Sequence, residues 1–301
     1  MQSIILSLFP LIALIVSGYY LKKKQFLHEG FWVGAEKLNY YILFPIMLFA
    51  NLATAKLDLS IMKSIVLVVG VVLSIACIVL FALRFIFKTQ TTEFGVYMQS
   101  NTRFNTYMGL AIVAALFQQQ GMAIFAIILA LTIPVVNILA VLSLTNQDNM
   151  DFKSIFLALA KNPLILGCMV GAGFNLSGLP LWIGFELFLK QLALCSLPLG
   201  LLCVGAALQF MALKNNLFPL LLNTFSRLLI MPALAYFCCL WFAVPKLEMQ
   251  VFVLYFALPT ASASYILTKV LGGNSQLMAG VISLQTLSSA ITLPLVLSFI
   301  L

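Results

Sequence analysis

The stretch "QSNTRFNTYMGL", residues 99–110, places strongly polar side chains inside a long apolar segment. Asn101, Arg103 and Asn105 stand at alternate positions, so a permanent cation lies between two amides. No acidic residue occurs in the apolar segment that contains them, residues 95–117. The composition of the whole chain determines which surroundings these three side chains meet.

The composition is typical of an all-α integral membrane protein without a separate soluble domain. Of the 301 residues, 63% are hydrophobic and only 8% are charged, and the mean hydropathy is +1.13. Soluble domains contain about 25% charged residues. Apolar runs of about 20 residues, the length that crosses a hydrocarbon core of roughly 30 Å, recur along the chain. We therefore expect the lipid bilayer to be a partner of nearly every segment.

Two other classes of ligand are not expected. The net charge is +8, but the basic residues form no stripe with interleaved aromatic residues, which argues against nucleic-acid binding. The six cysteines fall within apolar runs and show no metal-ligand spacing, so we expect neither a metal site nor a cofactor.

Short polar stretches divide the chain into ten apolar segments. We expect membrane-spanning helices at residues 3–21, 33–55, 62–87, 95–117, 121–145, 154–175, 182–209, 216–243, 249–270 and 275–300. Ten spans place both termini on one side of the membrane. The odd-numbered loops carry most of the basic residues, namely Lys22, Lys23, Lys24, Lys37, Arg84, Lys88, Lys153, Lys214 and Lys269, whereas the even loops carry Lys56, Lys63 and Lys246. By the positive-inside rule, both termini lie outside the cytoplasm.

The ten segments suggest two inverted five-helix repeats, residues 1–147 and 148–301. An odd number of spans in each half gives the halves opposite orientations, an arrangement typical of secondary transporters with a substrate site at the repeat interface. Three pairs of residues stand at matching places in the two halves: Pro45 and Pro198, Pro134 and Pro294, and Tyr107 and Tyr265.

The fourth segment of each half is the polar one. Segment 249–270 contains Pro259, followed by Thr260, Ser262 and Ser264. Proline removes a backbone donor and clashes with the carbonyl four residues earlier, so we expect a helix break there. In lipid such a break requires a protein or water partner, and broken segments at matching positions point to a transporter's binding site.

Arg103 is our candidate for binding a carboxylate. A cation near the centre of a span costs about 2.5–3.5 kcal/mol on insertion scales, so we expect it to face a cavity. Broken half-helices also offer N-terminal N–H groups, which favour anions. The alternative is that Arg103 snorkels to the interface or caps an exposed carbonyl end.

The neighbouring polar residues have structural alternatives as well. Asn101 and Asn105 are candidate ligands or interhelical hydrogen-bonding residues. The hydroxyls of Thr260, Ser262 and Ser264 either face the cavity or bond back to the helix backbone. Tyr107 is a further candidate at the same site, and Pro45, Pro198 and Pro259 are candidate breaks or hinges.

The chain resembles the auxin efflux carrier family, in its bacterial branch of dicarboxylate permeases. The matching stretches are "NTRFNTYMGL" at 101–110, "KNPLILGCMVG" at 161–171, "LPLGLLCVGAAL" at 197–208 and "LPTASASYILTKVLGG" from residue 258. The resemblance implies ten helices in two inverted repeats, interrupted and crossing fourth and ninth helices, and transport of an organic anion. The long central loop of plant members and their proline in segment four are both absent.

Three other ionisable residues fall within expected spans. Glu186 and Lys190 stand four positions apart in a favourable order, and Arg227 lies deep in segment 216–243. They form a structural ion-pair cluster or take part in ion coupling. The coupling ion stays open between H⁺ and Na⁺, the latter held by unwound carbonyls and hydroxyls.

These observations predict a secondary active transporter of a small carboxylate or dicarboxylate in the bacterial inner membrane, working by alternating access. The alternatives are a sensor or scaffold on a transporter fold and a sodium-coupled symporter of the bile-acid type. An enzyme is not expected, because the single histidine, His28, lies in a loop and no two carboxylates share a span. Charged rings and filter repeats typical of channels are missing. A homodimer is a further expectation.

Overall fold

The computed structural model describes residues 2–54, 59–144, 163–209 and 217–301, and these ranges contain helices and connections but no strands. This agrees with the composition, since a helix satisfies its backbone hydrogen bonds within one segment, as a lipid environment requires.

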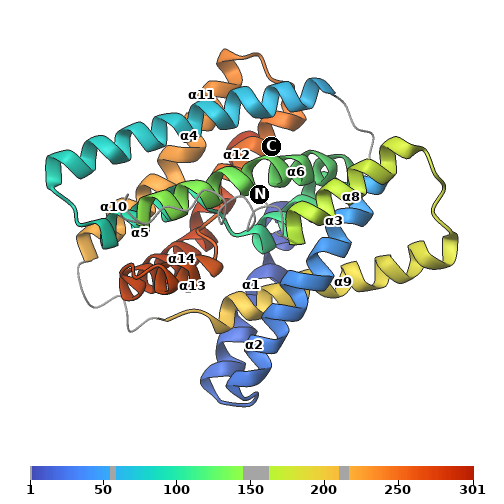
Figure 1. The fold of residues 1–301 in the computed structure, drawn as a ribbon, viewed down its shortest axis with the longest axis horizontal. Helices are drawn as coiled ribbons and strands as arrows, with labels where there is room; N and C mark the ends of the chain where they lie inside the picture. The colour runs from blue at the N-terminus through green and yellow to red at the C-terminus, as the bar shows by residue number, and fades with distance from the viewer. Residues whose placement is uncertain (1, 55–58, 145–162, 210–216) are drawn as a thin grey trace.

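The helices follow one another along the chain as shown in Figure 1. Their bounds are α1 (Gln2–Lys23), α2 (Glu29–Leu38), the π-helical turn η1 (Asn39–Leu43), α3 (Phe44–Ala53), α4 (Leu59–Phe87), α5 (Thr91–Thr102), α6 (Thr106–Leu144), α8 (Pro163–Ser177), α9 (Ile183–Ala206), α10 (Leu217–Phe225), the π-helical turn η4 (Ser226–Ile230), α11 (Met231–Trp241), α12 (Lys246–Ala257), α13 (Ala263–Val270) and α14 (Ser275–Ile300).

The expected segments correspond closely to these helices where the structure describes them. The segment 275–300 matches α14, and five described helical stretches are long and apolar enough to cross a membrane. The segment 95–117 is divided between α5 and α6, and its part from residue 106 onward is joined to the segment 121–145 within α6. The join contains Gln118, whose backbone is not helical, at φ 52° and ψ −149°. Residues 154–162 of the sixth segment lie outside the described residues, and α8 represents the remainder.

Two helix pairs make the most extensive contacts in the described structure, α1 with α9 and α3 with α8. Glycines allow the first pair to approach closely: a Cβ atom on Gly18 would overlap the carbonyl oxygen of Leu202, and one on Gly205 would overlap that of Ile15. Small residues at helix contacts are typical of membrane proteins, in which backbones pack closely. The pairs are reciprocal, because each joins the first expected span of one half to the second span of the other.

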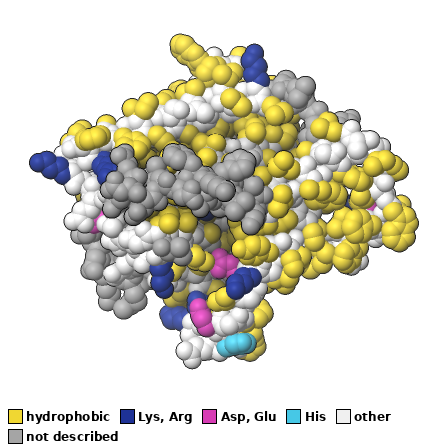
Figure 2. Space-filling model, viewed as in Figure 1, with side chains coloured by type: hydrophobic (Ala, Val, Ile, Leu, Met, Phe, Trp, Pro, Cys, Tyr) yellow, Lys and Arg dark blue, Asp and Glu magenta, His cyan; other side chains and the backbone are white. Residues whose placement is uncertain are grey.

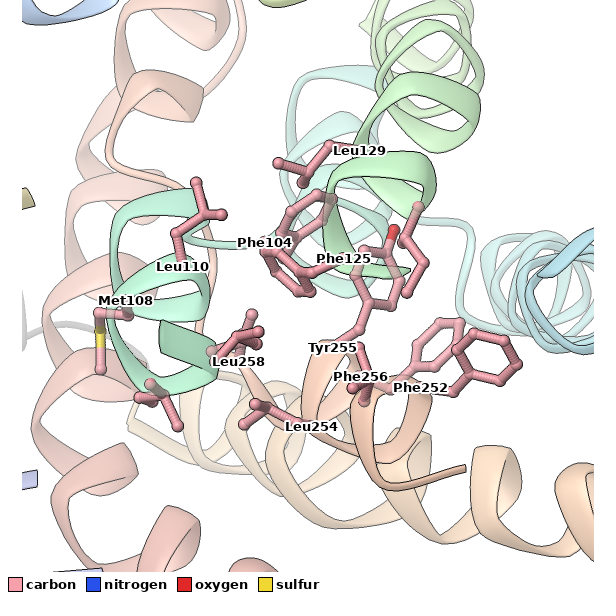
Figure 3. Close-up of a cluster of buried hydrophobic side chains, with 14 of the residues drawn as sticks. Phe104, Met108, Leu110, Phe125, Leu129, Phe252, Leu254, Tyr255, Phe256 and Leu258 are labelled. Carbon is pink, nitrogen blue, oxygen red and sulfur yellow. The ribbon is translucent and has the colours of Figure 1, made fainter. Parts of the chain in front are cut away.

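The core lies around α12, which is buried from Gln250 to its end. Every residue from 251 to 258 is at most 2% exposed. Figure 3 shows Phe104 and Phe125 beside Tyr255, and the ring centroids of Phe104 and Tyr255 are 4.4 Å apart. A helix that is apolar on all sides belongs in the interior. Because Phe104 lies between α5 and α6, this aromatic core directly supports the interruption in the polar stretch.

The outer surface is largely apolar. Large side chains such as Phe85 and Trp241 are more than 80% exposed, as expected for residues that face lipid. Figure 2 shows charged side chains gathered at one end of the molecule, near α2. There Lys22 and Glu29 form an ion pair at 3.0 Å.

Candidate functional site

The helix that carries the polar stretch is interrupted at residues 103–105. α5 ends at Thr102, Arg103 has an extended backbone at φ −85° and ψ 153°, and α6 begins at Thr106. The side-chain oxygen of Asn105 accepts a hydrogen bond from the N–H of Met108 at 3.1 Å. Asn105 therefore caps the first turn of α6.

Local side-chain hydrogen bonds explain why α5 ends without a proline. The Ser100 hydroxyl and the Asn101 amide each donate to the Tyr97 carbonyl at 3.0 Å, and the Thr102 hydroxyl donates to the Met98 carbonyl at 2.7 Å. Such bonds compete with the helical pattern and bend helices. The residue types "SNT" before Arg103 thus favour a helix end at this place.

The second interruption lies between α12 and α13 and contains Pro259. α12 ends at Ala257 and α13 begins at Ala263. Leu258, the residue before the proline, is extended at φ −69° and ψ 140°. The ring of a proline disfavours the helical conformation in the residue that precedes it, so the local sequence explains this end as well.

The two interruptions meet in space and satisfy each other's backbone groups. The N–H of Asn105 donates to the carbonyl of Pro259 at 2.7 Å. The Thr260 hydroxyl lies 2.8 Å from the Ser100 carbonyl, and the Thr260 N–H donates to the Gln285 side chain at 2.8 Å. Unpaired backbone groups are costly in lipid, so each break depends on the other.

Arg227 lies behind this contact and is fully buried. Its guanidinium donates to the carbonyls of Asn101 at 2.7 Å, Leu258 at 2.8 Å and Tyr255 at 3.4 Å. These carbonyls belong to the ends of α5 and α12. Arg227 therefore caps the exposed carbonyl ends of these two helices, a role that the sequence alone suggests as an alternative for Arg103.

A cavity of about 80 Å³ lies beside the two interruptions, with room for several water molecules. Four of the candidate residues line it: Arg103, Asn105, Tyr107 and Ser262. The remaining lining is mixed, with polar groups from Glu36, Tyr40 and Asn137 and apolar side chains from Ile133, Val136 and Leu164.

Two donors in this cavity are well placed for an anion. Arg103 donates from Nη1 to the Gln99 side chain at 3.3 Å, and it has no ion pair among the described residues. The Asn105 side chain is only 1% exposed, and its Nδ2 has no hydrogen-bond partner within the described ranges. Buried amides normally have partners, so this donor is available to a ligand.

The other four candidate residues are buried near the two interruptions: Asn101, Pro259, Thr260 and Ser264. The Asn101 side-chain oxygen accepts from the Ser226 hydroxyl at 3.0 Å, while Pro259 and Thr260 make the contacts between the interruptions described above. The Ser264 hydroxyl is buried and has no partner in the described part of the chain. None of these four residues lines the cavity, and Asn101, Pro259 and Thr260 instead hold the interruptions in place.

The three ionisable candidates do not form one cluster. Glu186 and Lys190 form an ion pair at 2.6 Å along α9, where both side chains are partly exposed. Arg227 is separate from them and uses backbone carbonyls as its partners.

Pro45 and Pro198 lie in helices that continue past them. Pro45 stands at the start of α3, directly after the π-helical turn η1, and Pro198 lies inside α9. Near them, the Asn39 side chain donates to the Ser196 carbonyl at 3.0 Å and accepts from the Ser196 hydroxyl at 2.8 Å. This bridge joins the second expected span of each half.

Sequence reasoning missed a chain of polar side chains and one carboxylate. Gln285 donates to Asn223 at 2.9 Å, and Asn223 donates to the Ser100 hydroxyl at 2.9 Å. Both amides interrupt apolar runs, which is the signal that would have identified them. Glu36 lies near the start of its expected span and was therefore not expected at the cavity.

Comparison with known proteins identifies a family for the chain. A family model described as "Membrane transport protein" matches residues 3–153 and residues 149–297, which together cover nearly the whole chain in two repeats. A search of curated proteins found no match.

Proposed function

The chain belongs to the membrane transport protein family, the auxin efflux carrier family, and on this premise we propose that it moves a small organic anion across the cytoplasmic membrane. The substrate class is a carboxylate or dicarboxylate, as in the bacterial dicarboxylate permeases that the sequence resembles. The protein is a secondary active transporter that works by alternating access.

One observation carries this proposal: a cavity at the meeting place of two helix breaks contains a cation and an unpartnered amide donor. Arg103 and Asn105 both line it, and neither is paired with a carboxylate among the described residues. An arginine fork binds a carboxylate through two parallel hydrogen bonds. A cavity between discontinuous helices is also where transporters of this architecture hold their substrates.

The architecture that we propose has ten spans in two inverted repeats, residues 1–147 and 148–301, with the interrupted spans crossing at the cavity. The reciprocal packing of α1 on α9 and of α3 on α8 supports this proposal. If the two halves are inverted repeats, the symmetry that exchanges them also exchanges the α1–α9 pair with the α3–α8 pair.

We propose that both termini lie outside the cytoplasm of a bacterial inner membrane, an orientation that rests on the distribution of basic residues. Contacts among the connections support the part of this proposal that groups even-numbered connections on one side and odd-numbered ones on the other. Two even-numbered connections come together where Gln119 lies 3.5 Å from the Thr54 hydroxyl. Lys246 donates to the Leu301 carbonyl at 3.2 Å, which places the C-terminus beside another even connection. On the odd-numbered side, the Asn274 N–H donates to the Thr92 carbonyl at 3.1 Å.

Uptake into vesicles that contain only the purified protein tests the proposed function. We expect saturable accumulation of at least one radiolabelled anion from a set of malate, malonate, oxalate and an aromatic acid. Empty vesicles and vesicles with Arg103→Ala serve as controls. Binding of such an anion in a thermal-shift assay without any uptake would instead favour a sensor on a transporter fold.

A further inference from the structure

Arg227 is a buried cation without a counter-ion among the described residues. Its side chain is 0% exposed, and the two ion pairs in the described structure involve other residues. It lies in the π-helical turn η4, between α10 and α11. π-Helical turns inside α-helices are frequent at functional sites. A charge buried in this way is expensive unless its surroundings compensate it.

The compensation comes from the carbonyl ends of two helices. Arg227 donates to Asn101 in the last turn of α5, at 2.7 Å, and to Tyr255 and Leu258 at the end of α12, at 3.4 and 2.8 Å. The C-terminus of a helix carries a partial charge of roughly −0.5. Two such ends therefore present about one negative charge, which a single guanidinium balances.

Carbonyl groups at half-helix C-termini and in unwound backbone are also the groups with which many secondary transporters coordinate a Na⁺ ion. Here the same groups are occupied by a side chain that cannot dissociate. We propose that Arg227 is a built-in cation that takes the place of an exchangeable alkali ion, so that this site neither binds nor requires Na⁺.

Contacts of a neighbouring residue help to hold the guanidinium of Arg227 against the end of α5. The neighbouring Ser226 hydroxyl donates to the Asn101 side chain at 3.0 Å, so η4 bonds to the end of α5 through two successive residues. Arg227 does not line the cavity that contains Arg103. The inference thus concerns a different site from the proposed anion site, and its test requires no substrate.

The first experiment measures the thermal unfolding of the purified wild-type protein in NaCl, KCl and choline chloride at equal ionic strength. We expect the same Tm in all three salts, because the carbonyl groups are already occupied. A Tm that rises in Na⁺ relative to K⁺ and choline would overturn the proposal.

The second experiment removes the built-in cation with Arg227→Ala and adds guanidinium chloride at millimolar concentration, far below denaturing levels. We expect the variant to unfold on the order of 10 °C lower, because three helix-end carbonyls lose their donors. Guanidinium should restore most of this loss by entering the vacated space. Arg84→Ala is the matched control, since Arg84 lies in the last turn of α4 and contacts Thr91 and the ring of Phe94.

Two further variants separate charge from hydrogen bonding. Arg227→Gln keeps donors but loses the charge, and Arg227→Lys keeps the charge but cannot span both helix ends. We expect the lysine variant to be the more stable of the two and neither to reach the wild-type Tm. A folded Arg227→Ala with an unchanged Tm, or one that guanidinium restores no better than Arg84→Ala, would overturn the proposal. If no variant folds, the wild-type comparison of salts decides.

Discussion

The backbone N–H of Asn105 donates to the carbonyl of Pro259 at 2.7 Å, which joins two helix breaks 154 positions apart in the sequence. This bond helps to fix the position of Asn105, which lines the cavity and caps α6. The geometry of the candidate anion site therefore depends on both halves of the chain.

Arg103 should determine the affinity for the anion. Arg103→Lys keeps the charge but loses the planar fork, and we expect anion binding to weaken by about 1.5–3 kcal/mol, or roughly ten- to hundredfold. Arg103→Ala should abolish uptake at normal expression. Titration of the purified variants with the transported anion measures the first effect and vesicle uptake the second. An alanine variant that folds and binds with unchanged affinity would contradict the assignment.

Glu36 should make anion binding depend on pH. It lines the same cavity as Arg103, and an ionised carboxylate in such a low-dielectric space repels an anion. Protonation removes this repulsion, so binding should strengthen as the pH falls through the pKa of Glu36. Glu36→Gln should bind tightly at all pH values and lose this dependence.

Comparing Glu36→Gln with the wild type at each pH cancels titration of the anion itself. Equal pH profiles for the two proteins would exclude Glu36 as the source of the dependence. Glu29→Gln is a suitable control, because Glu29 lies at the molecular surface in an ion pair with Lys22.

The close contact between α1 and α9 should tolerate no side chain at Gly205. A Cβ atom there would overlap the Ile15 carbonyl, and overpacking costs about 1–3 kcal/mol even where side chains can adjust. Gly205→Leu should therefore lower the Tm strongly or prevent folding. Gly173→Leu is the matched control, because no atom of the described residues lies within 4 Å of its Cβ position, and its Tm should remain near the wild-type value.

The Gln285 side chain should stabilise the second break. Its oxygen accepts from the Thr260 N–H at 2.8 Å, and its nitrogen donates to Asn223 at 2.9 Å. Gln285→Leu leaves a buried N–H without its partner and should cost about 1–3 kcal/mol. The Tm measures the loss, and Gln285→Glu, which retains the acceptor, should recover part of it. An unchanged Tm for the leucine variant would show that Thr260 finds another acceptor.

Topology is testable by labelling single cysteines in a cysteine-free background. Cysteines at positions 119 and 301 should react with an impermeant reagent in whole cells, whereas those at positions 25 and 273 should be protected. If the cysteines at positions 25 and 273 react and those at positions 119 and 301 are protected, the orientation is opposite to the proposed one.

Much of the fold could be predicted from the sequence, because apolar segments are long and polar interruptions are short. The segment 275–300 reproduces α14, and the family resemblance is confirmed by the match over two repeats. The chemistry of Pro259 and of the Asn-rich stretch is local, so it can be recognised from neighbouring residues. These features depend on backbone preferences that each residue carries by itself.

The partners of Arg227 could not be predicted, since they are backbone carbonyls on two other helices. Its bond to Asn101 spans 126 positions, and no periodicity in the sequence encodes such a contact. Glu36 was missed for a related reason: the distance of a residue from the end of a span does not reveal whether a cavity reaches it. Tertiary packing determines both features.

The mutual dependence of the two breaks has a consequence for biosynthesis. When residues 103–105 leave the ribosome, the carbonyl of Pro259 that will accept the Asn105 N–H does not yet exist. At synthesis rates of about 5–20 residues per second, it follows on the order of 10–30 s later. During that interval the first half requires a wet or protein-lined site at the insertion machinery, because lipid would leave its backbone unpaired. The two halves should consequently mature together, and a chain cut between them should become stable only when both pieces are made in the same cell.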